Sequence, residues 1–259
     1  MSNITRSCNR LYDELREIQI TRSYTKYADG SVLYQSGNTM VLCSVIINQE
    51  LPAFIKNNIM QSGWLTAEYS MLPSATHIRS LRERSYSKPN SRSLEISRLI
   101  GRSLRACVDL EKLAPYNIIV DCDVIMADGG TRVASINGAF IALYDAITKL
   151  LLKINSDTVN NSPLHNLHIN DIIKTRVAAV SIGVFLKDLL VDLEYKEDSS
   201  CDADFNIVMN DDFSVIEFQG SNESGTNSLN KSLIYELLNL SENAISKIFH
   251  IYNEHKIIL

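Results

Sequence analysis

One stretch of the chain, residues 118–151, reads IIVDCDVIMADGGTRVASINGAFIALYDAITKLL. In its first part, apolar side chains alternate with Asp121 and Asp123, which predicts a strand over Ile118–Met126. After the glycine pair Gly129-Gly130, apolar residues recur at helical spacing, at Ile136, Phe140, Leu143, Ile147, Leu150 and Leu151. The stretch therefore predicts a strand, a sharp turn and a long helix in direct succession.

The segments around this stretch predict an α+β fold. A hairpin is expected from Ser31–Gln35 and Met40–Ile47, because turn residues separate the two runs. Further strands are expected over Val177–Phe185, Leu189–Tyr195, Phe205–Met209 and Phe213–Phe218, and helices over Ile96–Val108 and Leu233–Ile251. Strands mixed with helices and hairpins favour α+β over a doubly wound parallel sheet. The polar segment 156–174 is expected to be a long loop or the seam between two halves.

Composition narrows the class of protein. The chain has 259 residues, of which 45% are hydrophobic and 21% charged, and this excludes a disordered or low-complexity protein. No uncharged apolar run reaches the length of a membrane span, and no secretory signal follows the first charges. We therefore expect a protein that binds no membrane. Five cysteines without a C-x-x-C pair are typical of reduced thiols, so we also expect a cytoplasmic protein. His165 and His168 lie in a polar stretch without cysteine partners, which favours a surface loop over a zinc site.

The charges are unevenly distributed along the chain. Residues 74–105 carry eight basic residues against two acids, whereas residues 188–223 carry eleven acids against one lysine. The first block suits phosphate groups and the second suits a divalent cation. Alternatively, both blocks are solvated faces, or they neutralise each other across the fold or a subunit contact. Composition alone favours this alternative.

The turn Ala127-Asp-Gly-Gly-Thr-Arg132 is a candidate phosphate site. Glycines let backbone N–H groups approach an oxyanion, the following helix N-terminus adds partial positive charge, and Thr131 and Arg132 add donors. Arg92 precedes another predicted helix, and its guanidinium fork suits the same anion. Arg79 and Arg82 lie in a serine-rich segment that suits contact with an RNA backbone. Taken singly, the turn is also compatible with a mere reversal of the chain, and each arginine with a solvated surface residue.

A pair of acids forms the third candidate constellation. Asp198 and Asp204 are expected to flank a turn between strands, so that their carboxylates converge. Paired carboxylates suit Mg²⁺ or Mn²⁺, or a like-charge pair in which one raised pKa creates a general acid. The alternative is an acidic exposed turn.

Motifs in this order resemble the ribonuclease PH family. They cover about residues 10–250 and include WLTAEYSMLP at 64–73, THxR at 76–79, RxxEIxRLI at 92–100, VDCDVxxADGGTR at 120–132, DLEYxED at 192–198, DxNxVM at 204–209 and ExQG at 217–220. The resemblance implies one catalytic α+β domain over residues 1–259, assembled as a ring-shaped homo-hexamer, a trimer of dimers. Its implied activity is phosphate-dependent 3′-to-5′ trimming of precursor tRNA, which releases nucleoside diphosphates and is reversible.

The resemblance also implies roles for individual residues. Arg92, Gly130, Thr131 and Arg132 would bind inorganic phosphate, the co-substrate. Asp198 and Asp204 would form the catalytic centre and hold Mg²⁺ or Mn²⁺, and Arg79 and Arg82 would guide RNA. Where the family usually has an arginine after Met-Leu-Pro, this chain has Ser74, which would weaken contact with RNA. The alternative function is that of a catalytically silent RNA-binding ring subunit of an exosome-like assembly.

Overall fold

The structure is a computed structural model that describes residues 6, 9–52, 55, 62–82, 90–156, 162–185, 188–222 and 230–259. Its first sheet has the strand order β1-β2-β3-β5-β4. All neighbours pair antiparallel except β4, which runs parallel to β5. The strands are β1 (Ile18–Arg22), β2 (Gly30–Ser36), β3 (Thr39–Asn48), β4 (Trp64–Met71) and β5 (Asn117–Met126).

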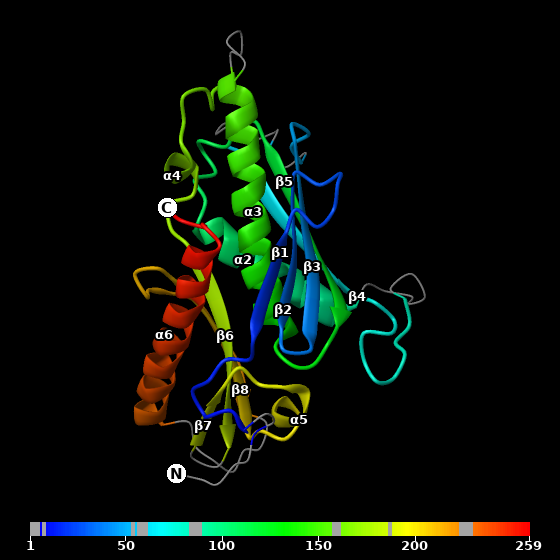
Figure 1. The fold of residues 1–259 in the computed structure, drawn as a ribbon, viewed down its shortest axis with the longest axis vertical. Helices are drawn as coiled ribbons and strands as arrows, with labels where there is room; N and C mark the ends of the chain where they lie inside the picture. The colour runs from blue at the N-terminus through cyan, green and yellow to red at the C-terminus, as the bar shows by residue number, and fades with distance from the viewer. Residues whose placement is uncertain are drawn as a thin grey trace.

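The second sheet is an antiparallel meander with the order β7-β6-β8-β9. Its strands are β6 (Val177–Phe185), β7 (Asp188–Val191), β8 (Ala203–Asn210) and β9 (Val215–Asn222). β6 is buried along nearly its whole length, because the sheet packs against α6 (Lys231–Glu254) on one side and contacts α3 (Thr131–Ser156) as well. Figure 1 shows α6 running alongside β6.

Helix α3 joins the two sheets. It packs on β2, β3 and β5 of the first sheet and on β6 and β8 of the second (Figure 1). The approach to β2 is close enough that a Cβ on Gly30 would lie 2.0 Å from the carbonyl oxygen of Ala142. Among the helices of the described residues, α3 is the one long and apolar enough to cross a membrane, but 72% of that apolar window is buried inside the protein. It is the core helix that the spacing from Ile136 to Leu151 predicts.

The remaining helices are α2 (Ser91–Ala106), α4 (Ile169–Ile172) and α5 (Tyr195–Asp198). The α+β class is confirmed, as are the hairpin, the central strand–turn–helix unit and the helix at the C-terminal end. In the described part of the segment 156–174, α4 interrupts an otherwise irregular course. The single-domain organisation stays a prediction.

Several boundaries differ from the predictions: β9 covers Val215–Asn222 instead of Phe213–Phe218, and α2 begins at Ser91 instead of Ile96. Two other differences have an evident physical cause. The strand expected over Leu189–Tyr195 ends at Val191, because Asp192 has a φ of +55° and Tyr195 already begins α5. The helix expected to reach Val108 ends at Ala106, where the N–H of Cys107 bonds back to the carbonyl of Leu104. The correction at Leu189–Tyr195 matters, since it places the acidic residue Asp198 on a short helix rather than in a turn between strands.

Candidate active site

One cleft, with a volume of about 290 Å³, lies at the N-terminal end of α3. It gathers the residues that the sequence singles out for phosphate and acid chemistry: Arg92, Gly130, Thr131, Arg132, Asp198 and Asp204. They come from the first turn of α2, from the turn into α3, from α5 and from β8. Segments distant in the sequence thus meet at one place.

The glycine turn has a backbone that other residues would strain. Gly129 and Gly130 have φ values of +75° and +65°, in the left-handed region that glycine adopts at no steric cost. A Cβ at Gly129 would also lie 2.3 Å from the carbonyl oxygen of Leu193. The turn leads straight into α3, whose first N–H groups lack partners within the helix and favour an anion.

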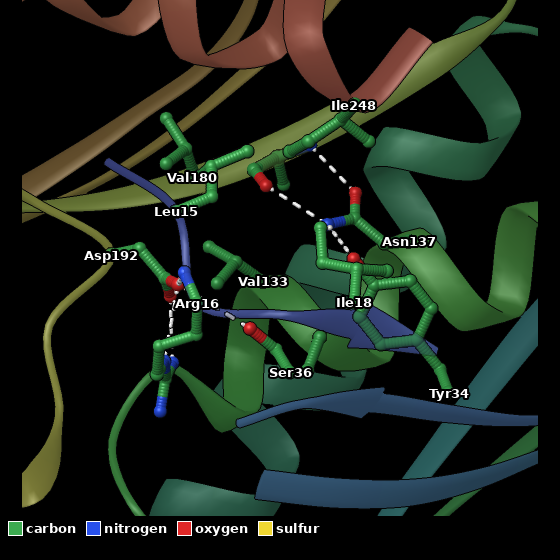
Figure 2. Close-up of a pocket in the computed structure, with 13 residues that line it drawn as sticks. Leu15, Arg16, Ile18, Tyr34, Ser36, Val133, Asn137, Val180, Asp192 and Ile248 are labelled. Carbon is green, nitrogen blue, oxygen red and sulfur yellow. Dashed lines mark hydrogen bonds and ion pairs between the residues drawn. The ribbon is translucent and has the colours of Figure 1, made fainter. Parts of the chain in front are cut away.

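A buried ion pair lies behind this turn (Figure 2). The guanidinium of Arg16 donates from Nη2 to Oδ1 of Asp192 at 2.7 Å, and the backbone N–H of Arg16 donates to Oδ2 at 2.7 Å. From Nη1 the same side chain donates to the carbonyl oxygen of Asp128 at 2.6 Å. Burial by itself would raise the pKa of Asp192, but the charge and hydrogen bonds of Arg16 hold it below its ordinary value. The ion pair thus holds the glycine turn in place. No local sequence pattern predicts this ion pair, because 176 positions separate Arg16 from Asp192.

Arg132 pairs with one acid and keeps one buried donor without a partner within the described part of the chain. Its Nη2 donates to Oε2 of Glu95 at 3.1 Å, and Oε1 of Glu95 accepts from the amide of Gln219 at 2.7 Å. The Nε of Arg132 is buried and has no hydrogen-bond partner among the described residues. A buried donor without a partner is unfavourable. An oxyanion in the cleft would satisfy it.

We expect Glu95 to act as a positioning residue for Arg132. Glu95→Ala removes the anchor of the guanidinium, and because the Glu95 side chain is 39% exposed, solvent screens this pair and limits its contribution to below about 1 kcal/mol. The same screening weakens the opposing effect, which is the loss of a negative charge near the bound phosphate. The variant should therefore bind inorganic phosphate about two- to fivefold more weakly in titration calorimetry.

Glu217→Ala is the matched control, because Glu217 of β9 accepts from an arginine of α2, Arg102, and does not line the cleft. Its phosphate affinity should equal that of the unaltered protein. Equal affinity in the Glu95 variant would show that Arg132 needs no anchor.

The two aspartates share the cleft with the arginines. The pKa of Asp198 is raised above its ordinary value, first because the group is partly buried and then because Asp204 carries a like charge. The charges of Arg132 and Arg92 oppose that shift. Asp198 and Asp204 form no ion pair within the described part of the chain. The carboxylate of Asp204 accepts a long hydrogen bond from the hydroxyl of Ser221 at 3.4 Å. Without a cationic partner among the described residues, both carboxylates suit a cation or proton transfer.

Two other acids of the same block have structural partners. Glu197 accepts from Nε of Arg6 at 2.7 Å, and Arg10 lies near both Glu197 and Asp192. Burial would raise the pKa of Glu197, but its hydrogen bond to Arg6 holds the pKa below its ordinary value. Part of the acidic block is thus neutralised by Arg6 and Arg10, which lie outside the basic block 74–105, whereas Arg102 and Glu217 form an ion pair between the two blocks. Neutralisation does not explain Asp198 and Asp204.

The donor set fits a cation that needs few protein ligands. Among the described residues, no group of three or more His, Cys, Asp or Glu side chains gathers as a metal cage would. Mg²⁺ commonly takes one or two carboxylates and completes its shell with water and substrate phosphates. The pair Asp198 and Asp204 suits that mode of binding.

The remaining predicted residues fall outside the cleft. Arg79 and Arg82 are exposed in the segment after β4 and do not line it, so their contact with RNA stays a prediction. His168 is the N-cap residue of α4, with its backbone N–H bonded to Asp171. Arg84 and Lys88 of the basic block lie outside the described residues.

The cleft also contains residues to which the sequence predictions assign no role. They are Met71, Thr76, Ser181, Tyr195 and Asn206. Asn206 could have been found from the alternation of a strand, since it lies two positions from Asp204 and so on the same face of β8. Ser181 gives no such indication, because it is one polar residue within a uniformly buried strand.

Solved structures share this fold, and two of three similar ones are described as exosomes. An Archaeoglobus fulgidus exosome with RNA bound to the active site matches with a TM-score of 0.76 and 23% identity, covering 96% of this chain and 93% of that one. Rice (Oryza sativa) Rrp46 matches with a TM-score of 0.72 and 16% identity, over 96% and 98% of the two chains. An archaeal exosome core matches with a TM-score of 0.69 and 22% identity, over 95% and 90%. At these identities the likeness establishes a shared fold.

Sequence profiles establish the family. Residues 14–148 match domain 1 of the 3′ exoribonuclease family, and residues 175–244 match domain 2. The first match ends within α3 and the second begins just before β6, so the profiles follow the first and second sheets. Because the two matches together span most of the chain, and in the order that the motifs predict, the chain belongs to the 3′ exoribonuclease family of ribonuclease PH-type proteins.

Proposed function

We propose that this protein is a phosphorolytic 3′-to-5′ exoribonuclease that trims the 3′ extensions of precursor tRNA and releases nucleoside diphosphates. The observation that carries the proposal is the single cleft in which Arg92, the turn 130–132 and the two aspartates meet. A cradle for a small oxyanion lies there beside a pair of carboxylates. This arrangement suits an attack by phosphate on an RNA phosphodiester.

The chain's own residues would bind and orient the reactants. The Nε of Arg132 and the first N–H groups of α3 would hold inorganic phosphate, together with Arg92, which also lines the cleft. An oxygen of that phosphate forms the new bond to phosphorus, while the bond from phosphorus to the 3′ oxygen of the preceding nucleotide breaks. A carboxyl group of the aspartate pair would deliver the proton that this leaving oxygen needs.

Asp198 and Asp204 would hold Mg²⁺ or Mn²⁺. The cation would neutralise negative charge that develops at the reacting phosphorus and the leaving oxygen. Because one phosphoester bond is exchanged for a diphosphate bond, the reaction would run backwards as nucleotidyl addition when nucleoside diphosphates are in excess. Arg79 and Arg82 would contact the incoming RNA backbone.

The assembly and location belong to the same proposal. The solved structures with this fold are exosome components, which supports a ring of subunits, here proposed as a homo-hexamer built from three dimers. The cysteine usage supports a cytoplasmic location.

A product assay tests the proposed activity. The purified protein is incubated with a 3′-extended tRNA and Mg²⁺, with and without inorganic phosphate, and the released nucleotides are identified by mass. The expected result is nucleoside diphosphates when phosphate is present and no release without it. Monophosphates released equally under both conditions would contradict the proposal and indicate hydrolysis.

A catalytically silent, RNA-binding ring subunit is the second candidate, because the structural neighbours are exosome subunits. It predicts RNA binding without nucleotide release under either condition. The unpartnered Nε of Arg132 and the two aspartates without ion pairs in the described residues favour the enzyme. A silent subunit has no need to maintain an anion site.

A further inference from the structure

A second groove, of about 650 Å³, adjoins the cleft. Three residues line both spaces: Thr76, Ala127 and Tyr195. Tyr195 is the largest of them, and it is 51% exposed. It begins α5, the same short helix that carries Asp198. An aromatic ring therefore lies at the boundary between the reacting centre and the groove beside it.

Tyr195 is held by a backbone hydrogen bond and by a contact of its ring. The backbone N–H of Tyr195 donates to Oδ1 of Asp128 at 3.2 Å, which ties α5 to the glycine turn. The phenol ring packs against the imidazole of His77, with 5.9 Å between the ring centroids and 59° between the ring planes. The His77 ring contacts the Tyr195 ring at an angle. A flat group in the groove can therefore stack on Tyr195 without displacing His77.

The charges of the groove affect what can enter it. Two acids, Asp128 and Glu194, and one lysine, Lys196, line its wall, so the wall carries a net negative charge that disfavours a phosphate backbone. A nucleobase is neutral and presents a flat π face, which stacks well on an aromatic side chain. The groove thus suits the base of a nucleotide whose phosphate lies in the cleft.

We infer that Tyr195, supported by His77, is a stacking platform for the base of one of the two nucleotides flanking the scissile linkage. The inference rests on the proposed function, since it assigns the substrate's bases to a subsite of the same active site. Every base has a π face, so the platform holds RNA 3′ ends without selecting their sequence.

RNA binding by Tyr195 variants tests this subsite. Fluorescence anisotropy of a 5′-labelled RNA oligonucleotide, with Mg²⁺ and without phosphate, reports affinity alone. Tyr195→Ala should raise the Kd by about 5- to 150-fold, the loss of one base–aromatic stack, whereas Tyr195→Phe keeps the ring and should bind as the unaltered protein does. Tyr24→Ala is the matched control, because Tyr24 is equally exposed at 51% and lines neither space.

Removal of the base from the RNA completes the test. Oligonucleotides with an abasic site at the last or the penultimate nucleotide should lose affinity for the unaltered protein, at one of the two positions, by the same factor as Tyr195→Ala. The Tyr195→Ala protein should then lose nothing further from that abasic site. The inference would be overturned if the abasic site raised the Kd of Tyr195→Ala by the same factor as it raises that of the unaltered protein. It would also be overturned if the Kd of Tyr195→Ala lay within twofold of that of the unaltered protein.

The result is distinguishable from a failure of the proposed function. Absence of phosphate-dependent release by the unaltered protein would contradict phosphorolysis, while the binding cycle would still report stacking. Normal phosphorolysis together with an unchanged Kd in Tyr195→Ala would refute the platform alone. No RNA binding by the unaltered protein would overturn both.

Discussion

Replacing Arg132 with alanine is expected to lower the rate of phosphorolysis by about 10³- to 10⁵-fold, the contribution of arginines that stabilise phosphoryl transfer in GTPases. The reason is geometric. Arg132 is anchored by Glu95, and its buried Nε has no partner among the described residues. Alanine removes both the positive charge and the donor that would hold the attacking phosphate in line. Single-turnover rates at saturating RNA, measured over a range of phosphate concentrations, provide the measurement.

Two further variants make the Arg132 result interpretable. Arg132→Lys keeps the charge but not the planar fork, so its rate should fall between those of the unaltered and alanine proteins. Arg98→Ala changes an exposed arginine of α2 that does not line the cleft, and its rate should be unchanged. If Arg132→Ala had a normal melting temperature and a rate within tenfold of normal, Arg132 would not be part of the phosphate site.

Replacing Asp192 with asparagine is expected to lower the free energy of unfolding by about 3 kcal/mol, because the buried charge of Arg16 loses its partner. Asparagine tolerates the left-handed backbone at this position, where φ is +55°, so the substitution isolates the charge. Urea unfolding at neutral pH measures the change. Because Arg16 also holds the glycine turn through Asp128, the variant should bind phosphate more weakly as well.

The pH dependence of that difference has a definite sign. The folded-state pKa of Asp192 lies below the ordinary value of 3.8, so its ionised form stabilises the fold at pH values above 3.8. That stability is lost as the pH falls further, toward the folded-state pKa. The difference in the free energy of unfolding between the unaltered protein and Asp192→Asn should therefore have its full value at neutral pH and shrink below about pH 4.

Asp13→Asn is the control for surface charge, since Asp13 pairs with Lys247 where both side chains are over a third exposed. Its effect should stay below about 1 kcal/mol. If Asp192→Asn were no more destabilising than this control, the ion pair behind the glycine turn would not support the fold.

Local patterns predict the central part of this fold well. Alternation in β5 and helical spacing in α3 are properties of contiguous residues, and so is the glycine turn between them. The same kind of alternation, with Leu65, Ala67 and Tyr69 buried, is present in β4 but is absent from the sequence predictions. The error at Leu189–Tyr195 has another origin, because the backbone turns at Asp192 to meet Arg16, a residue far away in the chain.

In the candidate site, too, some residues are predicted from the sequence and others are not. Its six central residues are found from motifs and from the resemblance they carry, and the structure brings these residues into one cleft. Their supports are set by tertiary contacts. Glu95 meets Arg132 and Gln219 only after α2, α3 and β9 have packed together, and Tyr195 meets His77 only once α5 has docked beside the segment after β4. Such pairs leave no periodic trace in the sequence.

The most direct test follows the fate of the attacking group. The protein is supplied with unlabelled 3′-extended tRNA, Mg²⁺ and inorganic phosphate labelled with ³²P, and the products are separated. Phosphorolysis predicts that the label appears in the β-phosphate of the released nucleoside diphosphates, one label for each nucleotide removed, and that Arg132→Ala abolishes its incorporation. Nucleotides released without label would mean that water is the attacking group, and would contradict the phosphate site proposed at the start of α3.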